Sequence, residues 1–287
     1  MNYLYIYIGK LPEYIKYSIN SVMSVDKDAN IYLCTNEKSS YKNCNLINLN
    51  EIKSKKIDYL TNNNYFQNTN YENNPLWINS LLRILYLEKI AENYNIDSFV
   101  HFDSDIIVYE SFDKLRPIVK NNLVNITQHT LDQLIFGYSF FPNLEITKLL
   151  CKEVDLIIKN IEKHMDDNFG HPLNEMDILG KIFNFNSNIF NTLPILPYEK
   201  TPYVFDPASY GQYFGGTAQK PRKTFSIRVK EEHHIVGREI LSKRIKPKMI
   251  NNEPYVFHNN EKYKIVNLHI HSKQLNKFLP NNYKNYV

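Results

Sequence analysis

The chain has 287 residues, 43% of them hydrophobic and 14% aromatic, with a formal net charge of +4 at pH 7. This composition excludes a disordered chain. So small a charge gives no reason to expect a nucleic-acid partner, although it would not repel a phosphorylated substrate. Three cysteines, Cys34, Cys44 and Cys151, lack the spacing of a metal site and cannot all pair, which is typical of a reducing compartment.

No segment approaches the roughly 18 uncharged apolar residues that a membrane-spanning helix needs. The amino-terminal segment MNYLYIYIG has no basic leader, and its apolar run is too short for an export signal. We therefore expect a cytoplasmic protein with no transmembrane segment.

The chain opens with an alternation of strands and helices. Apolar runs at 4–8 and 31–34 predict two strands. Between them, apolar residues at helical spacing predict a helix: Ile15, Ile19, Val22 and Met23. Continuous apolar strands joined by a helix indicate a parallel sheet covered by helices, so the predicted fold class is α/β.

Residues 61–75 are polar and aromatic, and we expect a loop there. It is either an insertion without further role or a rim that orders over a substrate. Asn74 and Pro75 have the residue types of a helix cap and a first helical position, which predicts a helix over 76–93. Arg83 in this helix is either a surface ion-pair partner or a ligand of a phosphate or ribose.

The segment SFVHFDSDIIVY, residues 98–109, is the most informative of the chain. Its apolar runs at 99–102 and 106–109 predict two buried strands, with Asp103 and Asp105 between them. Side chains two apart at a strand end point to the same side, so both carboxylates can reach one object. They repel unless protonated or bridged by a cation, and Mg2+ or Mn2+ is the natural bridge. A short Asp-x-Asp pattern also occurs by chance in solvated turns.

Residues 144–163 have apolar side chains at helical spacing, which predicts an amphipathic helix that contributes only to the core. A short helix is then expected to begin at Asn174. Glu175 and Asp177 lie in its first turn, where carboxylates can complement the helix dipole. This explanation suits Glu175, whereas Asp177 stays a candidate for catalysis.

The segment 204–217 contains three of the eight glycines, Gly211, Gly215 and Gly216. Glycine allows a backbone to approach a ligand closely, so we expect Gly215 and Gly216 to border a bound ligand. With Asp206 and other polar residues nearby, the segment is more typical of a sugar-binding rim than of a spacer.

Residues 220–248 are basic, but glutamates offset the charge, and a solvated surface is expected. The pair His233 and His234 would diverge in a strand and is discounted as a metal site. The last predicted strand, 264–273, places four polar residues on one face: Asn267, His269, His271 and Lys273. An edge strand that exposes polar residues to water explains two histidines and a lysine in register poorly.

Two carboxylates and one imidazole around a divalent metal leave open positions for diphosphate oxygens, and a lysine adds a point charge for the same phosphates. A metal so placed acts as a Lewis acid on a departing nucleoside diphosphate. This chemistry favours a transferase that moves a sugar from a nucleotide to a hydroxyl.

These residues resemble the metal-dependent glycosyltransferases of the GT-A fold. Asp103-Ser-Asp105 is similar to their Asp-x-Asp motif, and Arg83 is similar to an arginine of the preceding helix. Residues 174–177 resemble, at both ends, the Asn-Asp-Gln-Asp segment of retaining galactosyltransferases and glycogenin-like enzymes, although the two middle residues differ. In those enzymes a late histidine completes the metal site and a lysine follows it.

The resemblance therefore implies a metal ligand at His269, with His271 as the alternative, and phosphate binding by Lys273. It implies Mn2+ or Mg2+ as cofactor, a UDP-hexose or similar nucleoside-diphosphate sugar as donor, and a glycan or glycoconjugate as acceptor in polysaccharide biosynthesis. By its position, Asp206 is either the base that takes the acceptor proton in an inverting reaction or a cap of the turn at Pro207.

The resemblance covers most of the chain and implies a single GT-A-type domain over 1–287, with a Rossmann-like, mainly parallel sheet. Within it we expect a nucleotide-binding part at 1–120, an acceptor- and sugar-binding part at 121–218, and a basic extension at 219–287 that completes the site.

Two alternatives remain open at the level of the sequence. One is a phosphohydrolase of the haloacid dehalogenase type, in which Asp103 is the nucleophile and Asp105 an acid, although its motif usually lies near the amino terminus. The other is a non-catalytic protein that binds sugar nucleotides or glycans.

Overall fold

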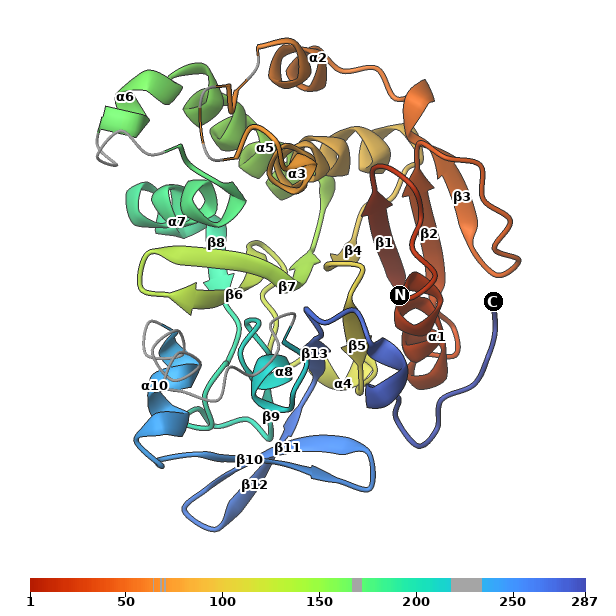
Figure 1. Cartoon of the computed structure of the whole chain (residues 1–287), viewed down its shortest axis with the longest axis vertical. Coiled ribbons are helices and arrows are strands. Elements are labelled where there is room, and N and C mark those ends of the chain that lie inside the picture. The colour runs from red at the N-terminus through yellow and green to blue at the C-terminus, as the bar shows by residue number, and fades with distance from the viewer. Residues whose placement is uncertain (64, 68, 70, 167–171, 218–233) are drawn as a thin grey trace.

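A mostly parallel sheet of seven strands forms the centre of the protein, in the order β3-β2-β1-β4-β7-β6-β8 (Figure 1). The computed structural model describes residues 1–63, 65–67, 69, 71–166, 172–217 and 234–287. The strands of this sheet are β1 (Asn2–Tyr7), β2 (Asn30–Thr35), β3 (Asn45–Asn48), β4 (Phe99–His101), β6 (Val124–Thr130), β7 (Gln133–Phe141) and β8 (Phe190–Thr192). Only β7 runs antiparallel to its neighbours. The predicted α/β class is confirmed.

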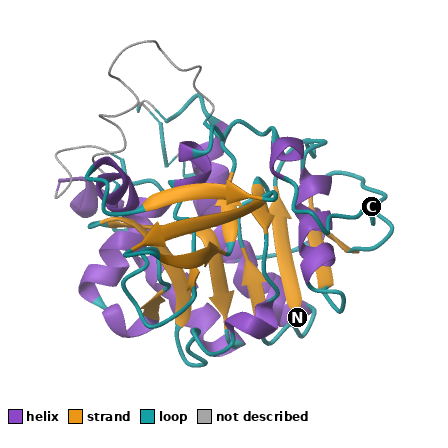
Figure 2. Ribbon diagram, turned by 90° about the horizontal axis from the view of Figure 1, so that it is seen from below, coloured by secondary structure: helices purple, strands orange, loops and turns teal. Residues whose placement is uncertain are grey.

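Helices cover both faces of the sheet (Figure 2). These helices include α1 (Ile15–Val25), α2 (Lys55–Asn62), α3 (Pro75–Asn93), α5 (Leu144–Lys159), the short α6 (Ile161–Asp166) and α7 (Glu175–Phe185). Successive side chains of a strand point to opposite faces. On β1, Leu4 and Ile6 therefore join the core under α3 and α5, whereas Tyr3 and Tyr5 join the core under α1.

The carboxy-terminal segment forms two smaller sheets. The first has the order β10-β11-β12-β9 and consists of β10 (Lys246–Ile250), β11 (Glu253–His258), β12 (Glu261–Ile265) and β9 (Tyr203–Val204). In the second, β13 (Asn267–His269) pairs antiparallel with β5 (Ile106–Val108). This pairing brings residues 267–269 beside the segment that follows β4 (Figure 1).

Short helical segments complete the described chain. They are α4 (Phe112–Leu115), α8 (Tyr210–Tyr213), α10 (Ile235–Leu241) and the 3-10 turns η1 (Leu49–Glu51), η2 (Ser187–Ile189) and η3 (Leu275–Phe278). None of the helices in the described part of the chain is both long and apolar enough to cross a membrane.

Two predicted elements differ from the structure. The helix expected over 144–163 is divided at Asn160, whose side chain bonds back to the carbonyl of Leu156 and ends α5. The strand expected over 264–273 ends at His269. A turn follows, closed by a hydrogen bond of 2.9 Å from the N–H of Lys273 to the carbonyl of Ile270.

The loop expected at 61–75 is irregular, as predicted, and its described aromatic residues pack together. The ring of Tyr71 contacts Phe66 and stacks on Trp77, at centroid distances of 5.5 and 4.4 Å. Residues 64, 68 and 70 of this loop lie outside the described residues, as do 220–233 of the predicted basic surface, including His233.

Candidate active site

The two aspartates lie in the short turn that joins β4 to β5. The N–H of Asp103 donates to the carbonyl of Phe136 on β7, and the N–H of Ile106 donates back to the carbonyl of Asp103 at 3.3 Å. The flanking strands are buried on both sides. Asp105 is 2% exposed. A buried framework therefore fixes the positions of both carboxylates.

The carboxy-terminal strand adds an imidazole to this turn. His269 pairs with Ile106 across β13 and β5, and the N–H of Ile270 donates to the carbonyl of Asp105 at 2.9 Å. The Nε2 atom of His269 lies 3.1 Å from Oδ1 of Asp105 and 3.5 Å from Oδ2 of Asp103. One ligand atom from each of the three side chains lies within 4.8 Å of the others.

Opposite charges perturb the protonation of all three groups. Burial alone would raise the pKa of both aspartates, but Arg83 and His269 lower the pKa of Asp103, and His269 and Lys273 lower that of Asp105. Burial would lower the pKa of His269, yet the two carboxylates raise it above its ordinary value. The cluster thus favours positive charge between its carboxylates.

This donor set fits a divalent metal ion. Two carboxylate oxygens and one imidazole nitrogen converge, and hard or borderline divalent ions take such ligands. Metal binding would displace the proton shared by His269 and the carboxylates, because a metal ligand must be deprotonated. Asp103, Asp105 and His269 could therefore hold the ion.

A lysine and a tyrosine border the cluster. The Nζ atom of Lys273 forms an ion pair with Oδ2 of Asp105, the carboxylate oxygen that does not face His269. Its ammonium lies 5.7 Å from the centroid of the Tyr14 ring, and the Tyr14 hydroxyl lies 3.5 Å from Oγ of Ser104. Tyr14 comes from the segment before α1, and no sequence pattern pointed to it.

Arg83 connects the cluster to α7. From α3 its guanidinium forms ion pairs with Oδ1 of Asp103 and, at 2.9 Å, with Oε2 of Glu175. Burial raises the pKa of Glu175 to about 7, against the opposing effect of Arg83. The sequence assigned Glu175 only to the helix dipole. The ion pair of Glu175 with Arg83, 92 residues earlier in the chain, could not be predicted from the sequence.

His271 lies beside the cluster and outside it. Its ring contacts the His269 ring edge-on, with centroids 4.3 Å apart, and its Nδ1 lies 3.4 Å from Nε2 of Gln212. Burial and the neighbouring His269 lower the pKa of His271 to about 3. Of the two histidines expected near the metal, the structure brings only His269 against both carboxylates.

Asp177 has a structural role in the position where it is found. Its Oδ2 accepts the N–H of Asn174, while the Asn174 side chain accepts the N–H of Asp177, which completes a capping box at the start of α7. Its Oδ1 accepts a hydrogen bond of 2.8 Å from Gln133. Both oxygens therefore have protein partners.

The surroundings of Asp206 are those of a structural carboxylate rather than of a catalytic base. Its side chain is fully buried, and its carboxylate accepts hydrogen bonds from the backbone N–H groups of Ser209, Tyr210, Gly211 and His269, at 2.6 to 2.9 Å. Burial raises its pKa, and these N–H groups oppose that shift. As the proton acceptor that was one of the two expectations, this carboxylate would first have to give up backbone hydrogen bonds. The alternative expectation, a turn cap, agrees with these contacts.

The glycines expected near a bound ligand support the histidine strand instead. The carbonyl of Gly216 accepts the N–H of Ser272 at 2.8 Å, and a Cβ atom on Gly216 would lie 2.7 Å from the carbonyl oxygen of Gly211. Gly215 has a φ of +94°, a conformation that other residues rarely adopt. Gly216 therefore allows the loop to pack closely under residues 270–272, whereas Gly215 allows the turn through its positive φ.

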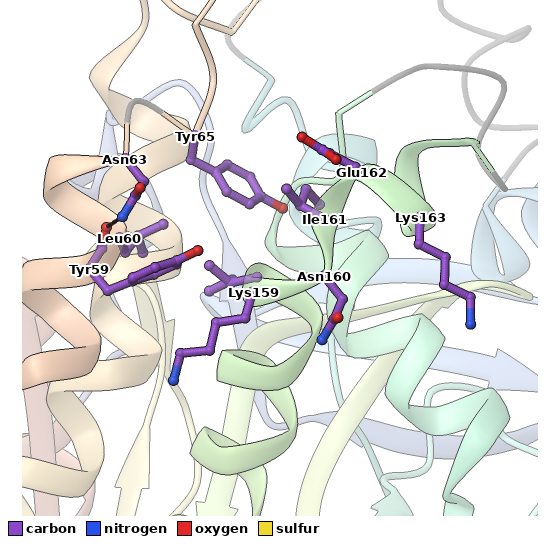
Figure 3. Close-up of a pocket in the computed structure, with 10 residues that line it drawn as sticks. Tyr59, Leu60, Asn63, Tyr65, Lys159, Asn160, Ile161, Glu162 and Lys163 are labelled. Atoms are coloured by element: carbon purple, nitrogen blue, oxygen red, sulfur yellow. Dashed lines mark hydrogen bonds between the residues drawn. The ribbon is translucent and has the colours of Figure 1, made fainter.

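The described cavities lie away from the cluster. Figure 3 shows one of about 480 Å3 between the end of α2 and the junction of α5 with α6, where Tyr59, Tyr65 and Lys159 are among the lining residues. A second, also of about 480 Å3, is lined by residues within 114–120 and 191–203. Neither is lined by an aspartate or histidine of the cluster, so the chemistry of the side chains, and not the size of a cavity, locates the candidate site.

Comparison with solved structures shows the architecture. The galactosyltransferase LgtC, in complex with donor and acceptor sugar analogues, aligns over 97% of this chain and 94% of its own, with a TM-score of 0.51 and 11% identity. The chain has the GT-A fold. At this identity the likeness shows the fold alone.

Two further solved structures have lower scores. Mouse xyloside xylosyltransferase 1 in its apo form has a TM-score of 0.46 and 13% identity, over 68% of this chain and 86% of its own. The glycosyltransferase GlyE of Streptococcus pneumoniae TIGR4 has a TM-score of 0.43 and 13% identity, over 75% and 49%. No family model and no curated protein sequence matches the chain.

Proposed function

We propose that the protein is a metal-dependent glycosyltransferase that moves a sugar from a nucleoside-diphosphate sugar to a hydroxyl of a glycan. The observation that carries this proposal is the convergence of Asp103, Asp105 and His269 in a GT-A fold. A UDP-hexose as donor, and Mn2+ or Mg2+ as the ion, are parts of the same proposal. The single domain over 1–287, with its nucleotide-binding, acceptor-binding and carboxy-terminal parts, remains part of it too.

The three ligands would hold the ion at the end of β4 and leave positions open for diphosphate oxygens. When bound, the metal supplies Lewis-acid stabilisation of the departing nucleoside diphosphate. Lys273 is placed to contribute a second positive charge, because its ammonium already contacts the outer oxygen of Asp105. On binding, a phosphate oxygen would compete with that carboxylate for the same ammonium.

Arg83 is proposed to orient the donor from the side of Asp103, whereas Lys273 lies on the side of Asp105. Its guanidinium spans Asp103 and Glu175, and its planar group can bind two oxygens at once. Glu175 fixes the direction of this guanidinium from α7. We therefore place the phosphate or ribose of the donor near Arg83.

Asp177 remains a proposal for the acceptor side, since it is half-buried at the start of α7, two residues after Glu175. It would first have to release the hydrogen bond from Gln133. The fold does not support the phosphohydrolase alternative or the non-catalytic alternative. Asp103 and Asp105 are proposed as metal ligands, not as nucleophile and acid.

A donor screen tests the proposal. Purified protein is heated with UDP-, GDP- and ADP-sugars, each with and without Mn2+, and the thermal midpoint is recorded. Ligands that bind only the folded state raise this midpoint, so one nucleotide should raise it only when the metal is present.

The active donor is then incubated with a panel of oligosaccharides, and released nucleoside diphosphate is measured with and without acceptor. Metal-dependent binding with neither transfer nor donor hydrolysis would instead favour a binding protein. Release of phosphate from sugar phosphates without nucleotide binding would favour a phosphohydrolase.

A further inference from the structure

The outer face of the four-stranded sheet carries a regular arrangement of lysines and aromatic rings. The register of β10, β11 and β12 creates two rows across the strands, each with one ring between two lysines: Lys246, Phe257 and Lys262 in one row, and Lys248, Tyr255 and Lys264 in the other. We call these six residues the lysine face. The opposite side of β11 and β12 is apolar, with Val256 and Ile265 fully buried in the core.

The rings position the ammonium groups of this face. The Nζ atom of Lys262 lies 4.5 Å from the centroid of Tyr255, and that of Lys248 lies 5.4 Å from the centroid of Phe257. Both distances are those of a cation–π contact. Such contacts hold the lysine stems along the sheet, and they leave the N–H groups free to meet an anion.

Three of these lysines have no carboxylate partner. Among the described residues, no acidic group lies within ion-pair distance of Lys246, Lys248 or Lys262, whereas Lys264 pairs with Glu253 at 2.7 Å and with Glu110 at 3.5 Å. All three are exposed. The face therefore presents unneutralised positive charge on a chain whose net charge is only +4.

Protection of a sheet edge explains only part of this pattern. Lysines on an edge strand discourage pairing with another chain, and this accounts for Lys246 and Lys248 on β10. Lys262 lies on β12 just before Lys264 and Ile265, the two residues of that strand that pair with β9, so edge protection can account for its position as well. It does not account for the rings between the lysines or for the contact of Lys262 with Tyr255.

We propose that the lysine face binds an acidic glycan, a chain whose sugars carry carboxylates or phosphates, and that such a chain is the acceptor. This inference rests on the proposed glycosyltransferase function. In each row the two lysines lie two strand spacings apart, about 9.5 Å, a separation that anionic groups repeated along a polymer can match. The polypeptide runs directly from β12 into β13 and its metal-cluster histidine, so the face and the site belong to one continuous segment.

Weak binding of the glycan at the lysine face is enough to raise its concentration near the site. A polymer bound at the face presents its end to the site at a raised effective concentration, without any new contact there. Docking to an anionic bilayer would also require apolar side chains that insert. At the end of the β10–β11 hairpin, Met249 and Ile250 are such side chains, each 37% exposed, but they are only two beside three unpaired lysines, so the bilayer is kept as an outcome of the test.

Binding of polygalacturonate tests the inference without donor, metal or turnover. The affinity of the full chain is measured by calorimetry in EDTA at low salt, with amylose as the neutral polymer. The variant Lys246→Gln/Lys248→Gln/Lys262→Gln should bind polygalacturonate more than about tenfold more weakly, since each lysine contributes to attraction by an anionic surface. Amylose should bind neither protein.

A matched variant removes the same charge elsewhere. Lys27, Lys53 and Lys152 are exposed and lie off the lysine face, so their joint replacement by Gln should change the affinity less than about twofold. Circular dichroism confirms that both variants fold.

Equal losses in the two variants, or no binding by the unmodified chain, would overturn the inference. So would tighter binding to phosphatidylserine vesicles or to a single-stranded oligonucleotide. The binding test contains no sugar donor, so its result does not depend on transfer activity. If polygalacturonate binds and no sugar transfer is found in the separate assay, the proposed function is rejected and the lysine face is still a binding site for an acidic glycan.

Discussion

Asp105 and Asp206 are both buried aspartates, and both contact His269, yet their surroundings suit them to different tasks. Asp105 meets the His269 side chain and the ammonium of Lys273, groups that can move or exchange a proton. Asp206 meets the His269 backbone and three further backbone N–H groups, which cannot leave without unfolding the loop. Exposure alone, at 2% and 0%, would not distinguish them.

The difference shows that the type of partner decides the role of a buried carboxylate. A carboxylate saturated by main-chain donors stabilises the conformation of those donors. One that faces side-chain cations can exchange them for a metal or a substrate. His269 serves both aspartates at once, so Asp206 fixes the strand that presents the imidazole to Asp105.

The largest expected effect is on the metal-binding carboxylate. Asp105→Asn should reduce sugar transfer by about 1,000-fold or more, because loss of the ion removes several kcal/mol of charge stabilisation. Mn2+ binding by calorimetry should be lost in parallel, while circular dichroism stays native. Asp113→Asn, at a largely exposed ion-pair residue, is the matched control and should bind Mn2+ normally. Unchanged Mn2+ affinity in Asp105→Asn would show that Asp105 does not bind the metal, and its contrast with Asp206 would then fail.

The next largest effect should distinguish His269 from His271 by their contributions to Mn2+ affinity. His269→Ala removes a proposed ligand and should weaken Mn2+ binding by about 100-fold, the upper end of what loss of supporting contacts costs. His271→Ala removes a ring that only contacts His269 edge-on, and its effect should stay below about tenfold. Titration of both variants with Mn2+ measures this. A larger loss in His271→Ala would move the metal to the other imidazole.

Asp206 should affect stability more than metal chemistry. Asp206→Asn replaces an acceptor of four N–H bonds by a group with its own donor, which should cost about 3 kcal/mol and lower the Tm by roughly 5 °C. Transfer measured well below the new Tm should fall much less than in Asp105→Asn. A variant with native Tm and no transfer would restore Asp206 as a catalytic base.

The last prediction concerns stability alone, at two glycines near the histidine strand, with the smallest effect of all at Gly215. A Cβ on Gly211 would collide with the backbone carbonyl of His269, so Gly211→Ala should cost about 3 kcal/mol through overpacking. Gly215→Ala meets open space and should cost only about 1 kcal/mol, for its positive φ. Urea unfolding compares the two. Equal losses would indicate that φ, and not the contact with His269, limits the residue at 211.

The sequence predicted the elements that depend on local patterns. Apolar runs located the strands around the aspartates, and Asn74 with Pro75 located the start of α3, where the Asn74 side chain does cap the helix. The same patterns failed where a side chain bonds back to its own helix, as Asn160 does, or where a turn follows a strand without glycine, as after His269.

The residues that surround the aspartates were only partly accessible from the sequence. The alternation of 267–273 indicated that the late histidines belong to the site, and it could not choose between them. The pairing of His269 with Ile106 makes that choice, through contacts between segments more than 150 residues apart. Glu175 was assigned only to the helix dipole because its partner Arg83 lies on another helix. The sequence could not choose between a base and a turn cap for Asp206, because its partners are backbone groups, which no residue type reveals.

Sequence by itself thus determined the fold class, the strands and the acidic pair, because hydrophobic periodicity and residue chemistry are local properties of the chain. The tertiary structure decided which imidazole faces that pair, which carboxylate is enclosed by the backbone and which glutamate orients the arginine. These outcomes depend on strand register and on donor and acceptor directions, and only the packed chain fixes both.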